Sequence, residues 1–508
     1  MNPGVTRAEI AALLAVGQDH AFAQPAGSQL RATVLGQRLA EAAGASAAEL
    51  ETCWWTGTLR FLGCTSHAFD MAQLFGDEIE VRAEAMLADN ASPPEMVRLM
   101  LAHAGPGRHG LDRVRALLGV LATGRAAMEM NFRTACEVSD VLATRLGVDS
   151  SVRASLATSF ERWNGRGFPT GCKGTAIPLP MRVTQLSQEF EALARAADVH
   201  AAVATIRARR GKTYDPTLAD LVVAHGPNWY DEVVAADPWD AALDVAPPGH
   251  ALTEAEAHDA LLVLADFTDL KSPWTGGHSR AVAGLAREAS GPLAEAAALV
   301  HDFGVVAIPN SILDKPSPLT RDERERMETH AMVTDQLLRR LAFTARLAVP
   351  AGGAHERLDQ SGYHRRPTAG ELDEAARVVA AADSYQAMVS DRPHRAALTA
   401  AEAAAELRRD ASAGRLDGEA VERVLASAGH RRVARPAQPG GLTSREVDVV
   451  RLMALGLTTR EIAAQLVVSP KTADHHVQHI YRKIGASTRG AAALFAIENG
   501  LVPAGRDS

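Results

Sequence analysis

The chain has 508 residues, of which 47% are hydrophobic and 5% aromatic, and its formal net charge at pH 7 is −8. This length allows about three domains, and the absence of any run of about 18 uncharged apolar residues argues against a membrane span. The four cysteines have no paired spacing, so we expect them to be reduced and buried. We therefore predict a cytoplasmic helical protein whose net negative charge does not favour contact with nucleic acid over the chain as a whole.

Two parts of the first 430 residues repeat one another. Residues 161–169 read ERWNGRGFP, and residues 356–364 read ERLDQSGYH, 195 positions later. Residues 181–193 match residues 376–388 at the same interval. This shared order predicts two copies of one helical domain, over residues 1–225 and 251–430, and the first copy carries an insertion. The Pro- and Asp-rich segment 226–250 is predicted to be the linker between them.

The second copy contains histidine and carboxylate residues of the kind that bind divalent metals. They are His278, the adjacent pair His301 and Asp302, then His330, His355 and Asp383. Imidazole and carboxylate groups together suit Fe, Mn or Zn. In an adjacent His-Asp pair, the histidine can bind one ion while the carboxylate bridges two. Two ions held in this way are a standard arrangement for hydrolysing phosphate esters.

Two blocks of this copy resemble the HD-GYP domains of the HD phosphohydrolase superfamily. They are VHDFGVVAIPNSILDKPSPLTRDERERMETHAM at 300–332 and HERLDQSGYHR at 355–365. The resemblance implies that the six residues are metal ligands and that Asp302 is also catalytic. It further implies that Gly362 and Tyr363 contact the ligand, a cyclic dinucleotide such as cyclic di-GMP or another phosphate ester.

Three positions of the second copy depart from that family. Val305 stands where the family has a lysine, and Ala354 where it has a second histidine. The GYP triplet ends in His364 instead of proline. These departures leave open whether the domain hydrolyses its ligand or only binds it.

The first copy has lost the metal-binding side chains. The matching positions are occupied by Ser28, Arg60, Phe61, Phe160 and Gln188. Phenylalanine and arginine do not coordinate cations. We therefore predict that this copy is structural, or that it binds a ligand without hydrolysing it.

The C-terminal segment has the start signals of successive short helices. Thr443 or Ser444 with Glu446 predicts a capped helix, and Ser469 before Pro470 predicts another. Two helices joined by a tight turn form a helix-turn-helix, whose second helix enters the major groove of DNA. Residues 469–489 carry four Lys or Arg against one Asp, which favours contact with phosphate.

The run GLTTREIAAQLVVSPKTADHHVQHIYRKIG at 456–485 resembles the LuxR-type DNA-binding domain. The resemblance implies a four-helix domain over 442–508, after a linker at 431–441, that binds double-stranded DNA through its third helix. The fourth helix, near 488–499, would support a homodimer. The implied DNA contacts are Lys471, Thr472, His475, His476 and Lys483.

The predicted fold is all-α, with two tandem HD-type domains and a four-helix helix-turn-helix domain. The fusion favours a DNA-binding transcriptional regulator whose tandem module senses a nucleotide or metal-dependent ligand. The alternative is a metal-dependent cyclic di-GMP phosphodiesterase with a DNA-binding tail. A third hypothesis is an interaction scaffold in which the histidines are vestigial.

Overall fold

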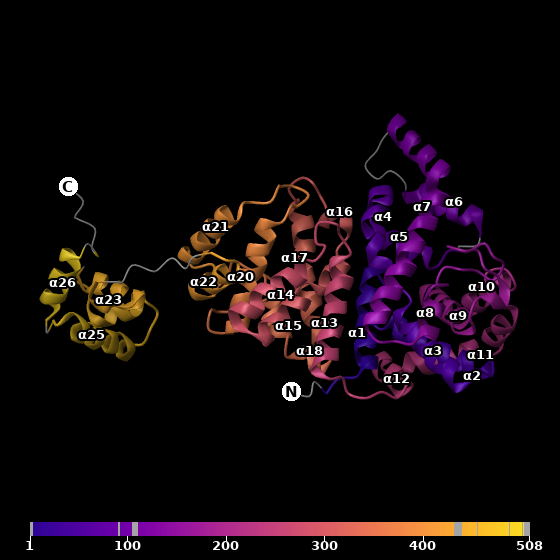
Figure 1. Cartoon of the computed structure of the whole chain (residues 1–508), viewed down its shortest axis with the longest axis horizontal. Coiled ribbons are helices and arrows are strands. Elements are labelled where there is room, and N and C mark those ends of the chain that lie inside the picture. Colours follow the sequence, from indigo (N-terminus) through magenta and orange to yellow (C-terminus); the bar gives the residue numbers. More distant parts are fainter. Residues whose placement is uncertain are drawn as a thin grey trace. The chain divides into compact units, whose positions relative to one another are not determined.

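The structure is a computed structural model that describes residues 4–89, 92–103, 110–430, 439–454, 456–486, 488–499 and 501. These residues form α-helices and short 3-10 helices, and no strand lies among them, which confirms the predicted all-α fold. The chain divides into two compact units, Met1–His430 and Arg431–Ser508 (Figure 1). None of the described helices is long and apolar enough to cross a membrane.

The first half of the larger unit contains twelve α-helices among its described residues. They are α1 (Arg7–Ala21), α2 (Ser28–Ala42), α3 (Ala47–Leu59), α4 (Ala68–Phe75), α5 (Glu78–Ala85), α6 (Pro93–His103), α7 (Gly110–Arg145), α8 (Ser150–Leu156), α9 (Leu179–Ala196), α10 (Val199–Arg209), α11 (Pro216–Ala235) and α12 (Pro238–Asp244). Two 3-10 helices, η1 (Cys64–His67) and η2 (Gly174–Ala176), connect parts of this half. Helices α4, α5 and α6 lie in the predicted insertion.

The second half follows the same plan without the insertion. Its helices are α13 (Glu254–Asp269), α14 (His278–Ser290), α15 (Pro292–Val300), η3 (Phe303–Ala307), α16 (Asn310–Leu313), α17 (Arg321–Leu338), α18 (Ala342–Ala345), α19 (Ala348–Gly352), α20 (Glu374–Val389), α21 (Ala400–Ser412) and α22 (Gly418–Ser427). Helices α14, α15, α17 and α20 take the places of α2, α3, α7 and α9.

Equivalent close contacts in the two halves support the duplication. A Cβ atom on Gly63 would lie 1.9 Å from the carbonyl oxygen of Ala135, and one on Gly304 would lie 2.1 Å from that of His330. The Gly63 amide donates to Ser139 Oγ at 2.9 Å, and the Gly304 amide donates to the Thr334 hydroxyl at 2.8 Å. In both halves only glycine allows the 3-10 helix to approach the long helix this closely.

The two halves share one hydrophobic core. Helix α1 packs against α2 and α3 of the first half and against η3 and α17 of the second. Its buried residues belong to one continuous cluster with those of α13, α15 and α20. In Figure 1, α1 accordingly lies between the indigo-to-magenta helices and the rose-to-orange helices. The predicted domains are therefore packed together as one body.

The segment 226–250, predicted to be a linker, is mostly helical instead. Helix α11 continues to Ala235, and α12 begins at Pro238 after a cap from Asp237. The Trp54 indole donates to the carbonyl of Ala242 at 2.8 Å, and aromatic side chains of this segment pack on the core. The segment is helical because Pro238 stands at the first position of α12, where proline is tolerated, and because packing on the core accommodates Pro227 inside α11. Residues 431–438 of the other predicted linker lie outside the described residues.

The four cysteines are free, as predicted. Cys53, Cys64 and Cys136 are buried, whereas Cys172 is partly exposed. Burial raises the pKa of the Cys136 thiol to about 12, so this thiol stays protonated. The prediction of burial is therefore wrong for Cys172, which lies in the irregular segment between α8 and η2 rather than on a core-facing helix.

The smaller unit contains η4 (Pro439–Gly441), α23 (Ser444–Ala454), α24 (Thr459–Gln465), α25 (Pro470–Ile484) and α26 (Arg489–Glu498). It has its own core, formed by Val450, Ile462, Val477 and Ile480 with their neighbours. Ser469 accepts a hydrogen bond from the Thr472 amide and so caps α25 as predicted. The four helices match the predicted helix-turn-helix domain.

Candidate metal centre and DNA-binding surface

The six candidate metal ligands of the second half lie together in two triads. His278, His301 and Asp383 form one triad, and the ligand atoms lie within 4.8 Å of one another. The other triad, which meets the same limit, consists of Asp302, His330 and His355. Residues separated by up to 105 positions are thus brought to one place by the helices that carry them.

Asp302 lies between the two triads. Its Oδ1 is 3.1 Å from His355 Nε2 and 3.5 Å from His330 Nε2, both in its own triad. Its Oδ2 is 3.5 Å from His301 Nε2 in the other triad. One carboxylate therefore faces both groups, which is the position that a bridging ligand needs.

Two of the imidazoles are held in the tautomer that a metal ligand requires. His301 Nδ1 donates to the carbonyl of Ala298 at 2.7 Å, and His330 Nδ1 donates to that of Met327 at 2.6 Å. In the neutral imidazole each Nε2 then carries the free electron pair, and it points into the cluster. Both Nε2 atoms are buried and have no hydrogen-bond partner among the described residues. A divalent cation would satisfy them, so the donor set fits a metal.

The electrostatics of the cluster also favour a cation. Burial opposes ionisation of Asp302 and Asp383, but the surrounding histidines hold the pKa of both carboxyls well below the usual range. Burial disfavours the charged form of His301, yet these two carboxylates raise its pKa to about 10. A metal would therefore replace a proton on His301, because metal ligands must be deprotonated.

Two buried carboxylates support the cluster without belonging to it. Asp269 accepts from the Ser279 amide at 2.9 Å and thereby fixes the first turn of α14, which carries His278. Burial raises the pKa of Asp269 to about 6. Glu356 accepts from the Arg365 amide at 2.7 Å and closes the loop after His355. The sequence reasoning missed both residues, although Glu356 belongs to the repeated ER dipeptide and could have been found from it.

Gly362 and Tyr363 lie beside the second triad. The Tyr363 ring stacks on His355, with centroids 5.1 Å apart and planes 11° from parallel. A Cβ atom on Gly362 would lie 2.5 Å from the carbonyl oxygen of His355, so glycine allows this loop to approach the backbone of residues 355–357 closely. Val305 and Ala354 are buried, and the six-residue cluster forms without contributions from either side chain.

The equivalent place in the first half has a different chemistry. Arg60 occupies the position of His301 and donates to Gln188 Oε1 at 2.8 Å and to the carbonyl of Ser159 at 3.0 Å. Phe61 occupies the position of Asp302, and its ring lies 4.4 Å from that of Phe22. Aromatic rings and a guanidinium group therefore replace the ligand cluster.

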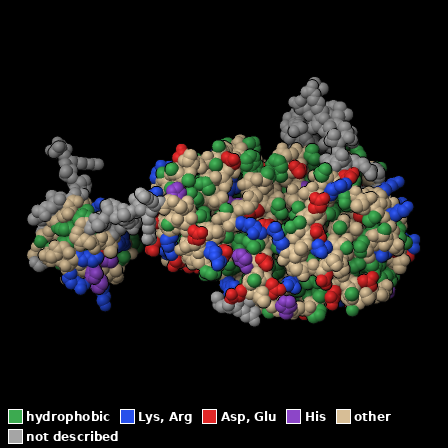
Figure 2. Space-filling view, viewed as in Figure 1, with side chains coloured by type: hydrophobic (Ala, Val, Ile, Leu, Met, Phe, Trp, Pro, Cys, Tyr) green, Lys and Arg blue, Asp and Glu red, His purple; other side chains and the backbone are tan. Residues whose placement is uncertain are grey.

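Helix α25 presents most of the candidate DNA contacts to solvent. Lys471, Thr472 and His475 are exposed, and His476 is partly exposed. Figure 2 shows Lys, Arg and His side chains gathered over this helix. Lys483 is also exposed, but its Nζ bonds Glu446 Oε2 at 2.7 Å. Its charge is therefore already paired with a carboxylate.

Glu446 is expected to make the stability of this unit depend on pH. Burial opposes its ionisation, but Lys483, the Thr443 amide and His479 lower its pKa to about 2. The folded state therefore gains stability above the usual glutamate pKa, and loses that gain as the pH falls toward 2. Glu446→Gln should cost about 1–2 kcal/mol at pH 6, after allowance for the partly exposed partners.

The measurement is amide hydrogen exchange of α23 and α25 in the full chain, corrected for intrinsic rates at each pH. The loss of protection in Glu446→Gln should shrink between pH 5 and pH 3. Asp448→Asn is the control, because Asp448 is about half exposed and its nearest cation is 3.8 Å away. An equal loss of protection in Glu446→Gln at pH 5 and at pH 3 would show that Glu446 is not the group responsible.

Comparison with known proteins agrees with this arrangement. The HD domain family matches residues 132–218 and 263–420, which lie in the two halves of the larger unit. The family of bacterial regulatory proteins of the luxR type matches residues 441–496. The chain therefore contains HD-family regions and a LuxR-family C-terminal domain. Both predicted resemblances are thereby confirmed.

Several curated proteins resemble the HD part of the chain. It is 28% identical over 403 residues to 3'3'-cGAMP-specific phosphodiesterase 3 of Vibrio cholerae serotype O1, a match that covers 77% of this chain and 88% of that protein. It is 39% identical over 153 residues to the cyclic di-GMP phosphodiesterase response regulator RpfG of Xanthomonas campestris, covering 28% of this chain and 40% of that protein. HD phosphohydrolase domains, the family that matches this chain, bind divalent metals generally.

The fold of this HD part also occurs in a solved structure. A crystal structure of a cyclic GMP-AMP specific phosphodiesterase of V. cholerae, V-cGAP3, superposes with a TM-score of 0.57 at 24% identity. The match covers 84% of this chain and 98% of that chain. At this level of identity the likeness establishes the tandem all-α fold.

Proposed function

We propose that this chain is a DNA-binding transcriptional regulator whose second HD domain binds a cyclic dinucleotide at a divalent-metal centre. The observation that carries the proposal is the convergence of six nitrogen and oxygen ligands in the same chain as a LuxR-family domain. The relatives named above are phosphodiesterases of cyclic GMP-AMP and cyclic di-GMP, which supports this class of ligand.

The two triads would each hold one ion. His278, His301 and Asp383 would bind the first, and His330 with His355 the second, while Asp302 contacts both. Mixed imidazole and carboxylate ligands suit Fe, Mn or Zn. When bound, such ions neutralise a phosphodiester and activate water. Tyr363 packs on His355 and limits the movement of that ligand.

Ligand binding would act on DNA affinity through the geometry of a homodimer. Symmetric dimers of helix-turn-helix proteins read half-sites about 34–36 Å apart. A change in the separation of two α25 helices would therefore change affinity without any change in their base contacts. Helix α26, the fourth of the domain, is the proposed dimer element.

Hydrolysis of the cyclic dinucleotide is the second candidate function. The position of Asp302 between the triads favours it, because a bridging carboxylate is a feature of two-metal hydrolases. In that case hydrolysis would remove the ligand that the same domain senses. The buried Val305 and Ala354, which replace polar residues of the family, reduce the number of groups available to hold phosphate.

The test is DNA binding with and without 3'3'-cGAMP or cyclic di-GMP. DNA fragments selected from a random pool should bind the full chain more tightly than unselected DNA. A cyclic dinucleotide should change that affinity at least tenfold in the wild type but not in Asp302→Asn. A chain with no sequence preference would refute the regulator. Cleavage that persists unchanged in Asp302→Asn would refute the hydrolytic role of this centre.

Lys471→Ala is expected to weaken DNA binding by a similar factor for every sequence. Lys471 is exposed in the first turn of α25, so its natural partner is a phosphate. Loss of one phosphate contact should reduce the slope of log affinity against log salt by about one. Fluorescence anisotropy over a salt series measures this slope. Arg321→Ala is the control, since it removes an equal charge from an 88% exposed side chain of the larger unit.

A further inference from the structure

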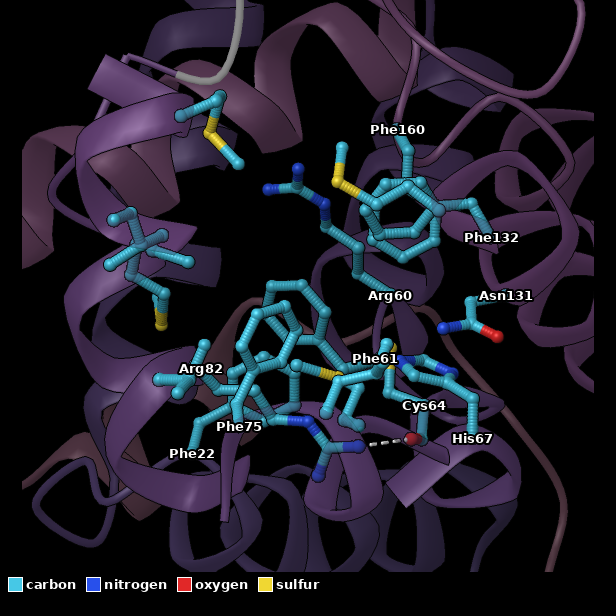
Figure 3. Close-up of a pocket in the computed structure, with 18 of the residues that line it drawn as sticks. Phe22, Arg60, Phe61, Cys64, His67, Phe75, Arg82, Asn131, Phe132 and Phe160 are labelled. Carbon is cyan, nitrogen blue, oxygen red and sulfur yellow. Dashed lines mark hydrogen bonds between the residues drawn. The ribbon is translucent and has the colours of Figure 1, made fainter. Parts of the chain in front are cut away.

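A cavity of about 160 Å³ lies in the first HD domain, at the place that the metal centre occupies in the second. Arg60, Phe61 and Phe160 line it, and these residues are the counterparts of His301, Asp302 and His355. In Figure 3, Phe132 and Phe160 lie on one side of the cavity and Arg60 reaches toward its centre. The degenerate site is therefore an apolar space instead of a metal centre.

The insertion supplies the other wall of this cavity. Helices α4, α5 and α6 contribute apolar side chains, including Phe75, Met86 and Met96, and α7 contributes Met128 and Phe132. Methionine side chains adapt to ligands of different shape. The second half lacks the equivalent helices, so this wall is a property of the first half.

Two buried guanidinium groups line the cavity with no described carboxylate in ion-pair contact. Arg60 and Arg82 are each 4% exposed. Arg60 donates to a side-chain amide and a backbone carbonyl, and Arg82 donates to the carbonyls of Cys64 and Ala21. Their Nε atoms have no partner, and neither residue forms an ion pair with a described carboxylate. The third arginine of the lining, Arg162, is paired with Glu189 at 3.0 Å.

We propose that this cavity binds an organic acid with an apolar body, such as a medium-chain fatty acid or an arylalkanoic acid. An unpaired buried charge is costly, and an anionic ligand would offset that cost. The apolar body would fill the space between the phenylalanine and methionine side chains, since apolar cavities of about 150 Å³ bind benzene-sized molecules. The carboxylate would pair with Arg60, which reaches toward the centre of the cavity.

One helix that lines the cavity also contacts the metal-binding half. Helix α5 contributes Val81 and Arg82 to the cavity, and the same helix carries Glu78. Glu78 bonds Lys271 Nζ at 2.6 Å and the Asn310 amide at 3.0 Å. Lys271 and Asn310 flank the segments that present His278 and the His301–Asp302 pair. An acid bound beside α5 would thus contact the helix whose Glu78 bonds Lys271 and Asn310 of the metal-binding half.

The test is isothermal titration calorimetry of the full chain with octanoate and with the neutral analogue octanol. Octanoate should bind the wild type at least tenfold more tightly than octanol. Arg60→Met should remove this preference while octanol still binds, which shows that the variant is folded. Ala85→Trp, which fills the cavity from α5, should abolish binding of both probes. Glu80→Trp is the matched control on the exposed face of the same helix and should bind as the wild type does.

Three results would overturn the proposal. The first is no binding of octanoate to the wild type, and the second is equal affinity for octanoate and octanol. The third is binding that persists in Ala85→Trp, since the probe would then occupy another place. The test is independent of cyclic dinucleotide binding, so the proposed function can fail while this site stands.

Discussion

Asp302→Asn is expected to remove both divalent ions from the second HD domain, whereas His330→Gln is expected to remove only one. The reason is the position of Asp302, whose two oxygens lie within 3.5 Å of nitrogens in both triads. His330 belongs to one triad only. Loss of a shared ligand should lower metal affinity at least ~100-fold, more than the loss of a supporting contact does.

Metal content of protein purified without oxygen, measured by mass spectrometry, distinguishes these outcomes. The wild type should contain up to two ions per chain, His330→Gln one, and Asp302→Asn none. Asp322→Asn is the control, because Asp322 is exposed on the same stretch of chain and makes no contact with the triads. Equal metal content in the wild type and Asp302→Asn would show that the cluster is not the metal centre.

The second large effect is expected at the ion pair between Glu78 and Lys271. Both side chains are completely buried, and the Nζ and Oε1 atoms are 2.6 Å apart. Burial lowers the pKa of Lys271, while Glu78 opposes that shift. Lys271→Met leaves a buried carboxylate with only the Asn310 amide as partner, so it should destabilise the larger unit by about 3–5 kcal/mol.

A double variant separates the pair from its surroundings. Glu78→Gln with Lys271→Met keeps an acceptor for the Asn310 amide and leaves no unpaired charge, so most of the lost stability should return. Denaturant unfolding of the full chain, followed by circular dichroism, measures each variant. The control is Lys315→Met, whose partner Glu323 is 27% exposed, and it should cost less than about 1 kcal/mol. If the loss of unfolding free energy in the double variant equalled the sum of the losses in the single variants, the two residues would act separately.

The local features of this protein were predictable from sequence. Capping residues such as Ser469 with Pro470, and the helical spacing of apolar residues, predicted the helices of the smaller unit. The repeated ER dipeptides revealed the two halves, because both copies use the glutamate to hold the same loop. The six candidate ligands were identified from motifs that resemble HD-GYP domains, and the structure brings these residues together.

Other features were decided only by tertiary structure. The Glu78–Lys271 pair joins residues 193 positions apart, and Lys483 meets Glu446 across 37 positions. The division of the ligands into two triads, with Asp302 between them, depends on how four helices pack. Segment 226–250 is helical because its aromatic side chains pack on the hydrophobic core. Each of these outcomes depends on burial and contact between distant segments, which local sequence patterns do not encode.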